Sequence, residues 1–296
     1  MTTSDRIEGA LRAAVARLTT GGCPPQLAEA IEYAMFPAGN RLRPRLAIAV
    51  ADALGGDTPL IDAAAVSLEF LHGASLIQDD MPAFDAAEER RGRPALHAVF
   101  GDAIAILAAD ALIIGAFETV ARDAASAPSL AAALTLELAR GTGSPHGAVA
   151  GQGWESEDDI DLAEYHRTKT AALFEAATAA GAVAAGHDPS RWRAVGHWLG
   201  RAYQIADDIA DEQSPETGGS DAELGRPNAL RALGMDGSVR VLDQCIRNAL
   251  DSVPPCSGRE QFISFLHALL VRFRPATYQS PTSRTGADRA AVEAHA

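Results

Sequence analysis

The sequence is poor in aromatic residues, cysteine and lysine. Aromatic residues make up 5% of the 296 residues, and the three cysteines form no Cys-x-x-Cys pair and have no flanking histidine pattern. This cysteine usage excludes a disulfide framework and a structural zinc site, and it is typical of a protein in the reducing cytoplasm. Lys169 is the only lysine, and the other 24 basic residues are arginine. A single compact ammonium group in such a chain marks Lys169 as a candidate functional residue.

Positive charge and long apolar runs are also scarce. The formal net charge is -14, from 25 basic and 39 acidic residues, so binding to nucleic acids and anionic membrane surfaces is not expected. The N-terminal residues lack the basic start and apolar run of a signal peptide. The longest apolar stretch, Ala103 to Phe117, is shorter than the ~20 residues that a membrane-spanning helix needs. We therefore predict a buried core helix there and no stable membrane insertion.

Helical periodicity dominates what is present. From Ile7 to Val271, alanine and leucine recur at spacings of three and four, and few β-branched residues alternate. Glycine and proline divide this region into roughly ten to twelve helices, with no strand. We predict an all-α fold with a single domain over residues 1–275. After Pro275 the apolar period is lost, which predicts a flexible C-terminal tail over residues 276–296.

An apolar helix that starts near Leu60 ends in a cluster of acidic residues. The cluster reads Gln78-Asp79-Asp80-Met81-Pro82-Ala83-Phe84-Asp85. Because the carboxyl end of a helix is already partly negative, carboxylates there are unfavourable unless cations compensate them. Carboxylate oxygens suit Mg²⁺, which keeps several waters and shares its other positions with substrate phosphates.

A second acidic cluster lies in another apolar helix. It reads Tyr203-Gln204-Ile205-Ala206-Asp207-Asp208-Ile209-Ala210-Asp211. Asp207 and Asp211 are four residues apart and share one face of the helix. One such cluster alone is more often a solvated helix end than a metal site. Two clusters with apolar flanks favour a metal site.

Basic residues precede and follow the first cluster. Arg90 and Arg91 come after it, and Arg41 and Arg43 stand beside a glycine turn near the N-terminus. Guanidinium groups at such positions suit bidentate binding of an anion held by metal ions, although each run on its own is also common on surfaces. The remaining candidate is Lys169, whose ammonium group suits a diphosphate.

Five motifs in this order resemble those of the polyprenyl synthases, also called trans-isoprenyl diphosphate synthases, from about Pro37 to Leu270. The motifs are Gly39-Asn40-Arg41-Leu42-Arg43-Pro44, the run from Leu68 to Asp80, Arg90-Arg91-Gly92-Arg93-Pro94, Lys169-Thr170, and Tyr203-Gln204-Ile205-Ala206-Asp207-Asp208. They are most similar to bacterial geranylgeranyl diphosphate synthases of carotenoid and bacteriochlorophyll pathways. The resemblance implies an isoprenoid synthase-type helical bundle around a deep central cavity, usually as a homodimer.

The resemblance also implies roles for individual residues. About three Mg²⁺ ions, or Mn²⁺, would be held by Asp79, Asp85, Asp207 and Asp211, with Asp80 and Asp208 supporting catalysis. The allylic diphosphate would be bound by Arg90, Thr170, Gln204 and the catalytic Lys169. The diphosphate of isopentenyl diphosphate would be bound by Arg43, His72 and Arg91.

The implied reaction condenses isopentenyl diphosphate with dimethylallyl, geranyl or farnesyl diphosphate. Metal-assisted departure of pyrophosphate leaves an allylic cation, which the isopentenyl double bond attacks before a proton is lost. One helical turn of about 5.4 Å matches about one isoprene unit, so residues one turn before Asp79 limit the product. Ala74 and Ser75 are small there, and the insertion containing Pro82 resembles that of short-product enzymes. We expect geranylgeranyl diphosphate, with farnesyl diphosphate as the alternative.

Two departures from the family pattern reduce positive charge. Asn40 stands where the family usually has lysine, and no lysine follows Asp211, where the family usually has a Gly-Lys pair. Our hypothesis is that Arg226 supplies part of the missing charge. These departures keep open a degenerate, non-catalytic or regulatory subunit of the same family.

Two further functions are alternatives with less support. A cyclising terpene synthase normally has an Asn/Asp-Ser/Thr-Glu motif in place of the second aspartate cluster. A di-iron helical bundle needs two Glu-x-x-His pairs, whereas the sequence has only the pair of Glu69 and His72.

Overall fold

The computed structural model describes residues 2–36, 39–213 and 228–273. Its α-helices are α1 (Thr3–Thr19), α2 (Pro25–Met35), α3 (Leu42–Ala53), α4 (Pro59–Asp80), α5 (Leu96–Phe100), α6 (Asp102–Asp123), α7 (Pro128–Thr142), α8 (Ala148–Trp154), α9 (Leu162–His166), α10 (Ala172–Ala184), α11 (Trp192–Gln213), α13 (Ala229–Asp251) and α14 (Arg259–Leu270). A π-helix, η1 (Arg167–Ala171), joins α9 to α10, and a 3₁₀-helix, η2 (Val271–Phe273), follows α14. The predicted tail and Arg226 lie outside the described residues.

The all-α prediction is confirmed, with one small exception. The sequence predicts no strand, but β1 (Glu89–Arg90) and β2 (Arg93–Pro94) form a short antiparallel ribbon. Arg91 and Gly92 form its turn with φ values of 56° and 72°. Two-residue strands are too short to produce an alternating sequence pattern, which explains why the sequence does not reveal them.

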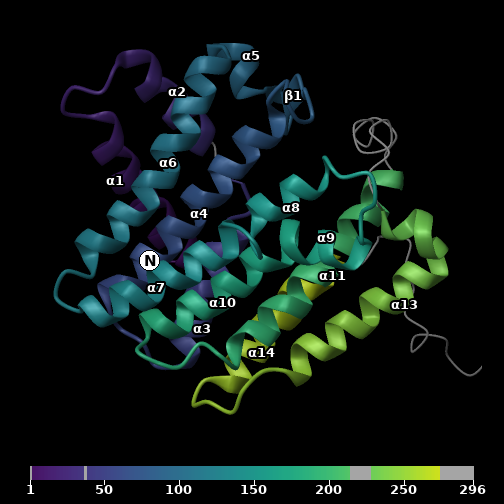
Figure 1. Cartoon of the computed structure of the whole chain (residues 1–296). Coiled ribbons are helices and arrows are strands. Elements are labelled where there is room, and N and C mark those ends of the chain that lie inside the picture. The colour runs from purple at the N-terminus through teal and green to yellow at the C-terminus, as the bar shows by residue number, and fades with distance from the viewer. Residues whose placement is uncertain (1, 37–38, 214–227, 274–296) are drawn as a thin grey trace, which may run out of the picture.

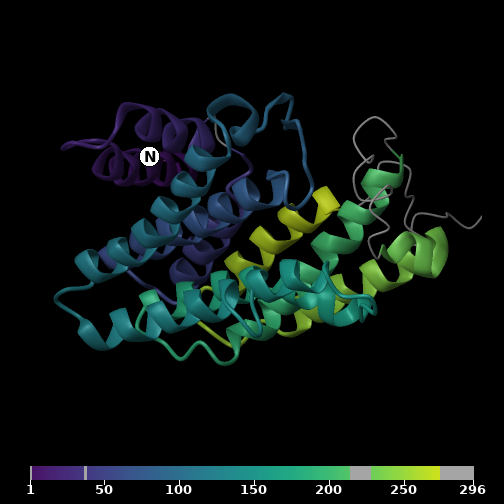
Figure 2. The same ribbon diagram turned by 45° about the horizontal axis from the view of Figure 1, so that its top comes forward.

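α4 is the central helix of the fold. It begins at Pro59, where proline is well tolerated because the first helical N–H groups have no partner within the helix. It ends at Asp80, within the acidic cluster where the sequence predicts the helix end. α4 packs against α6, α3 and α10 (Figure 1), while α1 and α2 form an outer layer beside α6 (Figure 2). The acidic end of α4 is therefore fixed by contacts along the whole helix.

α10 is buried along its whole length. All of its residues except Glu175 are buried, and it packs against α11, α7 and α3. Glycine allows these helices to come close together. A Cβ atom at Gly181 would lie 2.3 Å from the backbone oxygen of Ala47 in α3, and one at Gly196 would lie 2.4 Å from that of Phe174. Small residues therefore fill the core where these helices meet, in keeping with the low aromatic content.

α6 departs from the prediction of a buried core helix. One face packs on α4, but Ile106, Leu107 and Ile114 have exposed fractions of 51%, 49% and 67%. By length and composition, α4 and α6 are both long and apolar enough to cross a membrane. In α4, 72% of the apolar stretch is buried inside the protein, and in α6, 44%. The buried share of α4 is typical of a core helix. The apolar outer face of α6 needs another explanation.

We expect Gly181→Ala to destabilise the protein. The new methyl group would overlap the backbone of α3, and overpacking of this kind costs about 1 to 3 kcal/mol. Thermal unfolding followed by circular dichroism would measure the change. Gly9→Ala is the matched control, because Gly9 lies in α1 with no atom within 4 Å of its added Cβ; it should stabilise the helix by up to about 1 kcal/mol. Equal melting temperatures for Gly181→Ala and the wild type would contradict this account of the packing.

Candidate active site

The acidic end of α4 folds back on itself. The backbone N–H of Asp85 donates to the carbonyl oxygen of Asp79 at 3.0 Å, and that of Ala86 donates to Met81 at 3.1 Å. Burial raises the pKa of Asp79 to about 6; the Lys169 ammonium group opposes this shift and Asp85 adds to it. The fold thus holds a carboxylate where ionisation is unfavourable unless a cation is present.

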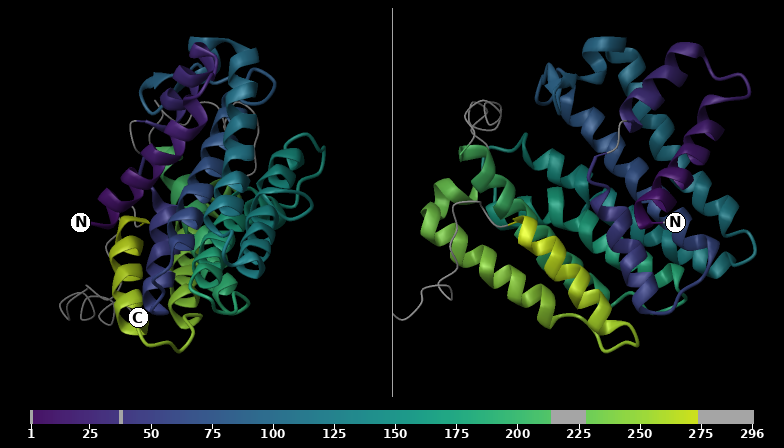
Figure 3. Two further views of the ribbon diagram at one scale, coloured as in Figure 1. Left: turned by 90° about the vertical axis from the view of Figure 1, so that its left-hand side faces the viewer. Right: turned by 180° about the vertical axis from the view of Figure 1, so that it is seen from behind.

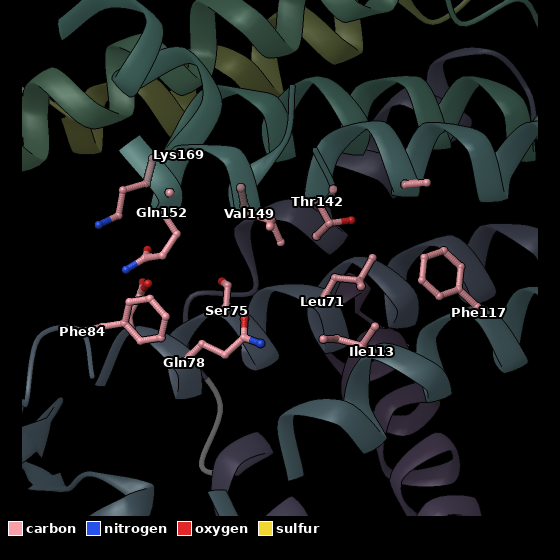
Figure 4. Close-up of a pocket in the computed structure, with 15 residues that line it drawn as sticks. Leu71, Ser75, Gln78, Phe84, Ile113, Phe117, Thr142, Val149, Gln152 and Lys169 are labelled. Carbon is pink, nitrogen blue, oxygen red and sulfur yellow. The ribbon is translucent and has the colours of Figure 1, made fainter. Parts of the chain in front are cut away.

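An elongated cavity of about 520 Å³ starts at this helix end. Its walls come from α4, α6, α7, α8, η1 and the loop after α4, and Figure 4 shows its two unlike ends. Lys169, Gln152 and Phe84 lie at one end, and Leu71, Ile113 and Phe117 lie at the other. A cavity with a polar mouth and an apolar interior fits a ligand that has a charged head and a hydrocarbon tail.

The structure separates the two residues that the sequence assigns to chain length. Ser75 lines the cavity, whereas Ala74 is 1% exposed, belongs to the hydrophobic core and is not among the lining residues. The sequence signal placed both one turn before Asp79, but only a three-dimensional arrangement decides which side of α4 faces the cavity. Phe117, which sequence reasoning missed, lines the far end from α6.

Lys169 is positioned by the π-helix η1. Gly151 of α8 allows η1 to approach, because a Cβ atom there would lie 2.3 Å from the Cα of Lys169. The ammonium group forms an ion pair with Glu155, whose side chain is 8% exposed. π-helical turns inside α-helices are rare and often occur at functional sites.

Glu155 is a residue of the site that the sequence did not indicate. Besides Lys169, its carboxylate accepts hydrogen bonds from the Tyr165 hydroxyl at 2.6 Å and from the Gln152 amide at 2.9 Å. In sequence it precedes the exposed acids Glu157 and Asp158, so the whole run is typical of a solvated loop. No sequence signal separates Glu155 from its exposed neighbours.

The second aspartate of each cluster is bonded inside the protein. Asp80 is buried and accepts from the Arg90 guanidinium at 2.6 and 2.7 Å. Asp208 is also buried and accepts from Gln204 at 2.8 Å and from the backbone N–H of Ala229 at 2.7 Å. Asp80 thus fixes the β1–β2 ribbon, and Asp208 fixes the start of α13 to α11. Neither residue lines the cavity at the end of α4.

Other predicted residues of α11 and η1 are linked to each other. The Thr170 hydroxyl donates to the side-chain oxygen of Gln204, whose amide donates in turn to Asp208. Asp207 is exposed, and it lies close enough to Tyr203 that, after burial, its charge raises the pKa of the Tyr203 hydroxyl, as does that of Asp211. The structure therefore brings Thr170, Gln204 and Asp208 together, whereas the neighbouring Asp207 faces solvent.

Cations gather between the two acidic clusters. Arg43 has a buried Nε atom without a hydrogen-bond partner, its guanidinium lies 4.9 Å from the centre of the Phe174 ring, and burial lowers its pKa. Burial, followed by the charges of Arg43 and Arg91, holds the pKa of His72 well below its usual value. His72 is therefore neutral at pH 7 and offers a hydrogen bond rather than a charge.

The chemistry of the donor set fits Mg²⁺ shared with a ligand. Within residues 2–36, 39–213 and 228–273, no three or more His, Cys, Asp or Glu side chains form a group that could hold a metal unaided. Mg²⁺ is commonly bound through one or two carboxylates, with waters and substrate phosphates completing its shell. Asp79 lines the cavity at the end of α4, and burial raises its pKa although the charges of Lys169 and Arg90 oppose the shift.

The family model for polyprenyl synthetase matches residues 24–253. The chain belongs to the polyprenyl synthetase family. A geranylgeranyl diphosphate synthase of Cereibacter sphaeroides is 44% identical over 282 residues, which cover 93% of this chain and 98% of the relative. The predictions of the family and of a prenyltransferase enzyme are thereby confirmed.

Solved structures share the fold. The apo structure of an FPP/GFPP synthase from Zymomonas mobilis has a TM-score of 0.78 and 27% identity, with 90% of this chain and 97% of that chain covered. A geranyltransferase from Helicobacter pylori complexed with magnesium and isoprenyl diphosphate has a TM-score of 0.76 and 24% identity, covering 92% and 98% of the two chains. The predicted isoprenoid synthase-type bundle is confirmed.

The di-iron alternative has no support from the structure. Glu69 accepts a hydrogen bond from the buried Arg41 at 2.7 Å, and Arg41 also donates to Glu8 at 2.8 Å. Breaking such a buried pair by removing one partner is strongly destabilising. Glu69 is therefore a structural residue that anchors the start of α3 to α4 and α1.

We expect Mg²⁺ binding to depend on pH through Asp79. Mg²⁺ binds the ionised carboxylate and must compete with a proton below about pH 6. Without Mg²⁺, this group stabilises the fold at low pH, because the folded protein holds the proton more tightly than the unfolded chain, and the contribution is lost as pH rises through about 6. The rise in Tm on adding Mg²⁺ should therefore be small at about pH 5 and larger at about pH 7.

Differential scanning fluorimetry at matched ionic strength would measure this dependence. Asp79→Asn is the control, because it removes the titrating group and keeps the side-chain size. Its response to Mg²⁺ should be weak and nearly independent of pH. A Mg²⁺-induced shift that is equal at both pH values in the wild type would contradict the assignment.

Proposed function

We propose that this prenyltransferase condenses isopentenyl diphosphate with an allylic diphosphate and makes the twenty-carbon geranylgeranyl diphosphate. The observation that carries the proposal is the cavity that runs from Asp79 and Lys169 to Phe117. Its polar mouth suits the diphosphate, and its apolar interior suits a growing isoprenoid tail. The name of the Cereibacter sphaeroides relative supports the same product.

Charge neutralisation at the mouth is the basis of the proposed catalysis. Asp79, Asp85, Asp207 and Asp211 would hold Mg²⁺ or Mn²⁺, which, when bound, neutralises charge that develops on a departing diphosphate. Lys169 would exchange its contact with Glu155 for the allylic diphosphate. Because the ammonium group is already held at the mouth, little reorganisation is needed when the substrate binds.

The remaining residues would position the substrates. Arg43 and Arg91 would bind the diphosphate of isopentenyl diphosphate, and the neutral His72 would donate one hydrogen bond to it. Thr170 and Gln204 would fix η1 against α11, so that Lys169 faces the allylic diphosphate. The apolar walls of the cavity exclude water, which would otherwise capture a cationic intermediate.

A homodimer is part of the proposal. The exposed apolar residues Ile106, Leu107 and Ile114 occupy the outer face of α6, and clustered exposed apolar residues mark protein interfaces. A second copy of the chain that covers this face would explain why α6 is so hydrophobic. Sedimentation velocity would show twice the mass of the 30.9 kDa chain if a dimer forms; a monomer at micromolar concentration would contradict it.

Product analysis tests the proposed function directly. The purified protein would be incubated with Mg²⁺, isopentenyl diphosphate and, separately, dimethylallyl, geranyl or farnesyl diphosphate, and the products would be identified by mass. A dominant twenty-carbon diphosphate is expected. A fifteen-carbon product would favour a farnesyl diphosphate synthase. No product from a folded protein would favour the non-catalytic subunit.

We expect Ser75→Phe to shorten the product. Ser75 lies one turn before Asp79 on the cavity wall, so a phenyl ring there would block the cavity about one isoprene unit from the mouth. The mass of the product should fall to fifteen carbons or fewer. Ser75→Ala is the matched control and should leave the twenty-carbon product unchanged. If Ser75→Phe still makes mainly the twenty-carbon product, the tail does not pass Ser75.

A further inference from the structure

The end of α14 returns to the entrance of α3. At one end of the pair, the backbone N–H of Gly258 donates to the carbonyl oxygen of Ala53 at 2.9 Å. At the other end, the Arg272 guanidinium donates to the side-chain oxygen of Asn40 at 3.1 Å. α14 therefore runs antiparallel to α3, as Figure 3 shows for the two neighbouring helices. This arrangement brings a cation to the turn that precedes α3.

A stack of aromatic rings holds that end of the chain in place. Phe273 is buried and meets Tyr203 edge-on, with ring centres 5.5 Å apart. Tyr203 contacts Phe174 at 5.4 Å, and Arg43 lies 4.9 Å above the Phe174 ring. The residue after Arg272 is thus anchored to the same aromatic stack that carries Arg43.

Arg91 approaches the same turn from the β1–β2 ribbon. A Cβ atom at Gly39 would lie 2.3 Å from a terminal nitrogen of Arg91, so the guanidinium rests against the Gly39 backbone. Gly39 and Asn40 are consecutive. Arg91 and Arg272 therefore contact adjacent residues, and Arg43 lies close by on the first turn of α3.

The three guanidinium groups lack acidic partners in the part of the chain that the structure describes. No carboxylate there lies within 4.0 Å of Arg43, Arg91 or Arg272. The Arg272 side chain is exposed and is held by a neutral amide. Its charge is therefore available to an anion, and a guanidinium can bind two phosphate oxygens at once.

We propose that Arg272 is a substrate-binding residue, the third guanidinium of the site that binds the diphosphate of isopentenyl diphosphate beside Arg43 and Arg91. This inference rests on the proposed function. Asn40 orients Arg272 by accepting its hydrogen bond, whereas a lysine at position 40 would repel it. Arg272 thus supplies the charge that the Asn40 side chain lacks, from a residue more than two hundred positions away in the chain.

Steady-state kinetics of Arg272→Ala would test the proposal. Loss of a charge-assisted contact should raise KM for isopentenyl diphosphate by about tenfold. The kcat and the KM for the allylic diphosphate should stay close to the wild-type values. Arg259→Ala is the matched control, since it removes the same charge near the opposite end of α14 and should leave all three constants unchanged.

A charge restored at position 40 would separate substrate binding from a structural role. In the double variant Asn40→Lys with Arg272→Ala, the new ammonium group lies in the same turn, so KM for isopentenyl diphosphate should recover most of its loss. Arg272→Lys should recover part of it. A structural defect at the end of α14 would not be repaired by a lysine at position 40.

Direct titration keeps this test independent of the proposed reaction. Isopentenyl diphosphate alone, without an allylic partner, would be titrated into the wild type, Arg272→Ala and Arg259→Ala by calorimetry. About tenfold weaker binding to Arg272→Ala alone is expected. Equal affinity of all three proteins would overturn the assignment of Arg272. An inactive wild type that still binds this ligand through Arg272 would instead overturn only the proposed condensation.

Discussion

A carboxylate held at the carboxyl end of a buried helix is the constraint on which the site depends. The helix end is already partly negative, and burial removes the water that would stabilise the ion. Cations from two elements partly offset this cost: the charges of Lys169 in η1 and Arg90 in the ribbon both favour the ionised form of Asp79. The packing of α4 against α6, α3 and α10 prevents the helix end from moving away from these groups. The cavity begins at this helix end.

The two acidic clusters use one arrangement twice. In each, an aspartate that is half-buried or exposed is followed by one that is buried and hydrogen-bonded to a neighbouring element: Asp80 to the ribbon, and Asp208 to α13. The buried member thus joins its helix to a neighbouring element. Glu155, whose side chain is largely buried, likewise holds the Lys169 ammonium group in an ion pair. In the candidate site, the largely buried carboxylates of Asp80, Asp208 and Glu155 thus hold neighbouring groups in place.

The sequence predicts the features of the molecule that depend on local patterns, such as the ends and periodicity of a helix. The apolar run from near Leu60 to the acidic cluster predicted α4 (Pro59–Asp80) closely, because helical periodicity is a local signal. Glu155, Phe117 and Arg272 could not be found this way, since each acquires its place through contacts with residues far along the chain. The outer face of α6 was mistaken for core because composition does not tell which neighbour covers a helix. From the sequence, Ala74 and Ser75 are equally good candidates for limiting product length, because only the rotation of α4 decides that Ser75 faces the cavity.

The π-helix η1 rotates α9 relative to α10 about their common helix axis. Each residue of an α-helix advances the helix by about 100°, so one added residue in η1 turns everything before it relative to everything after it. α10 must present its small residues to α3, α7 and α11, while Lys169 must face the cavity. A regular helix would have to compromise between these two orientations. The wide turn lets Lys169 line the cavity while α10 keeps its packing against α3, α7 and α11.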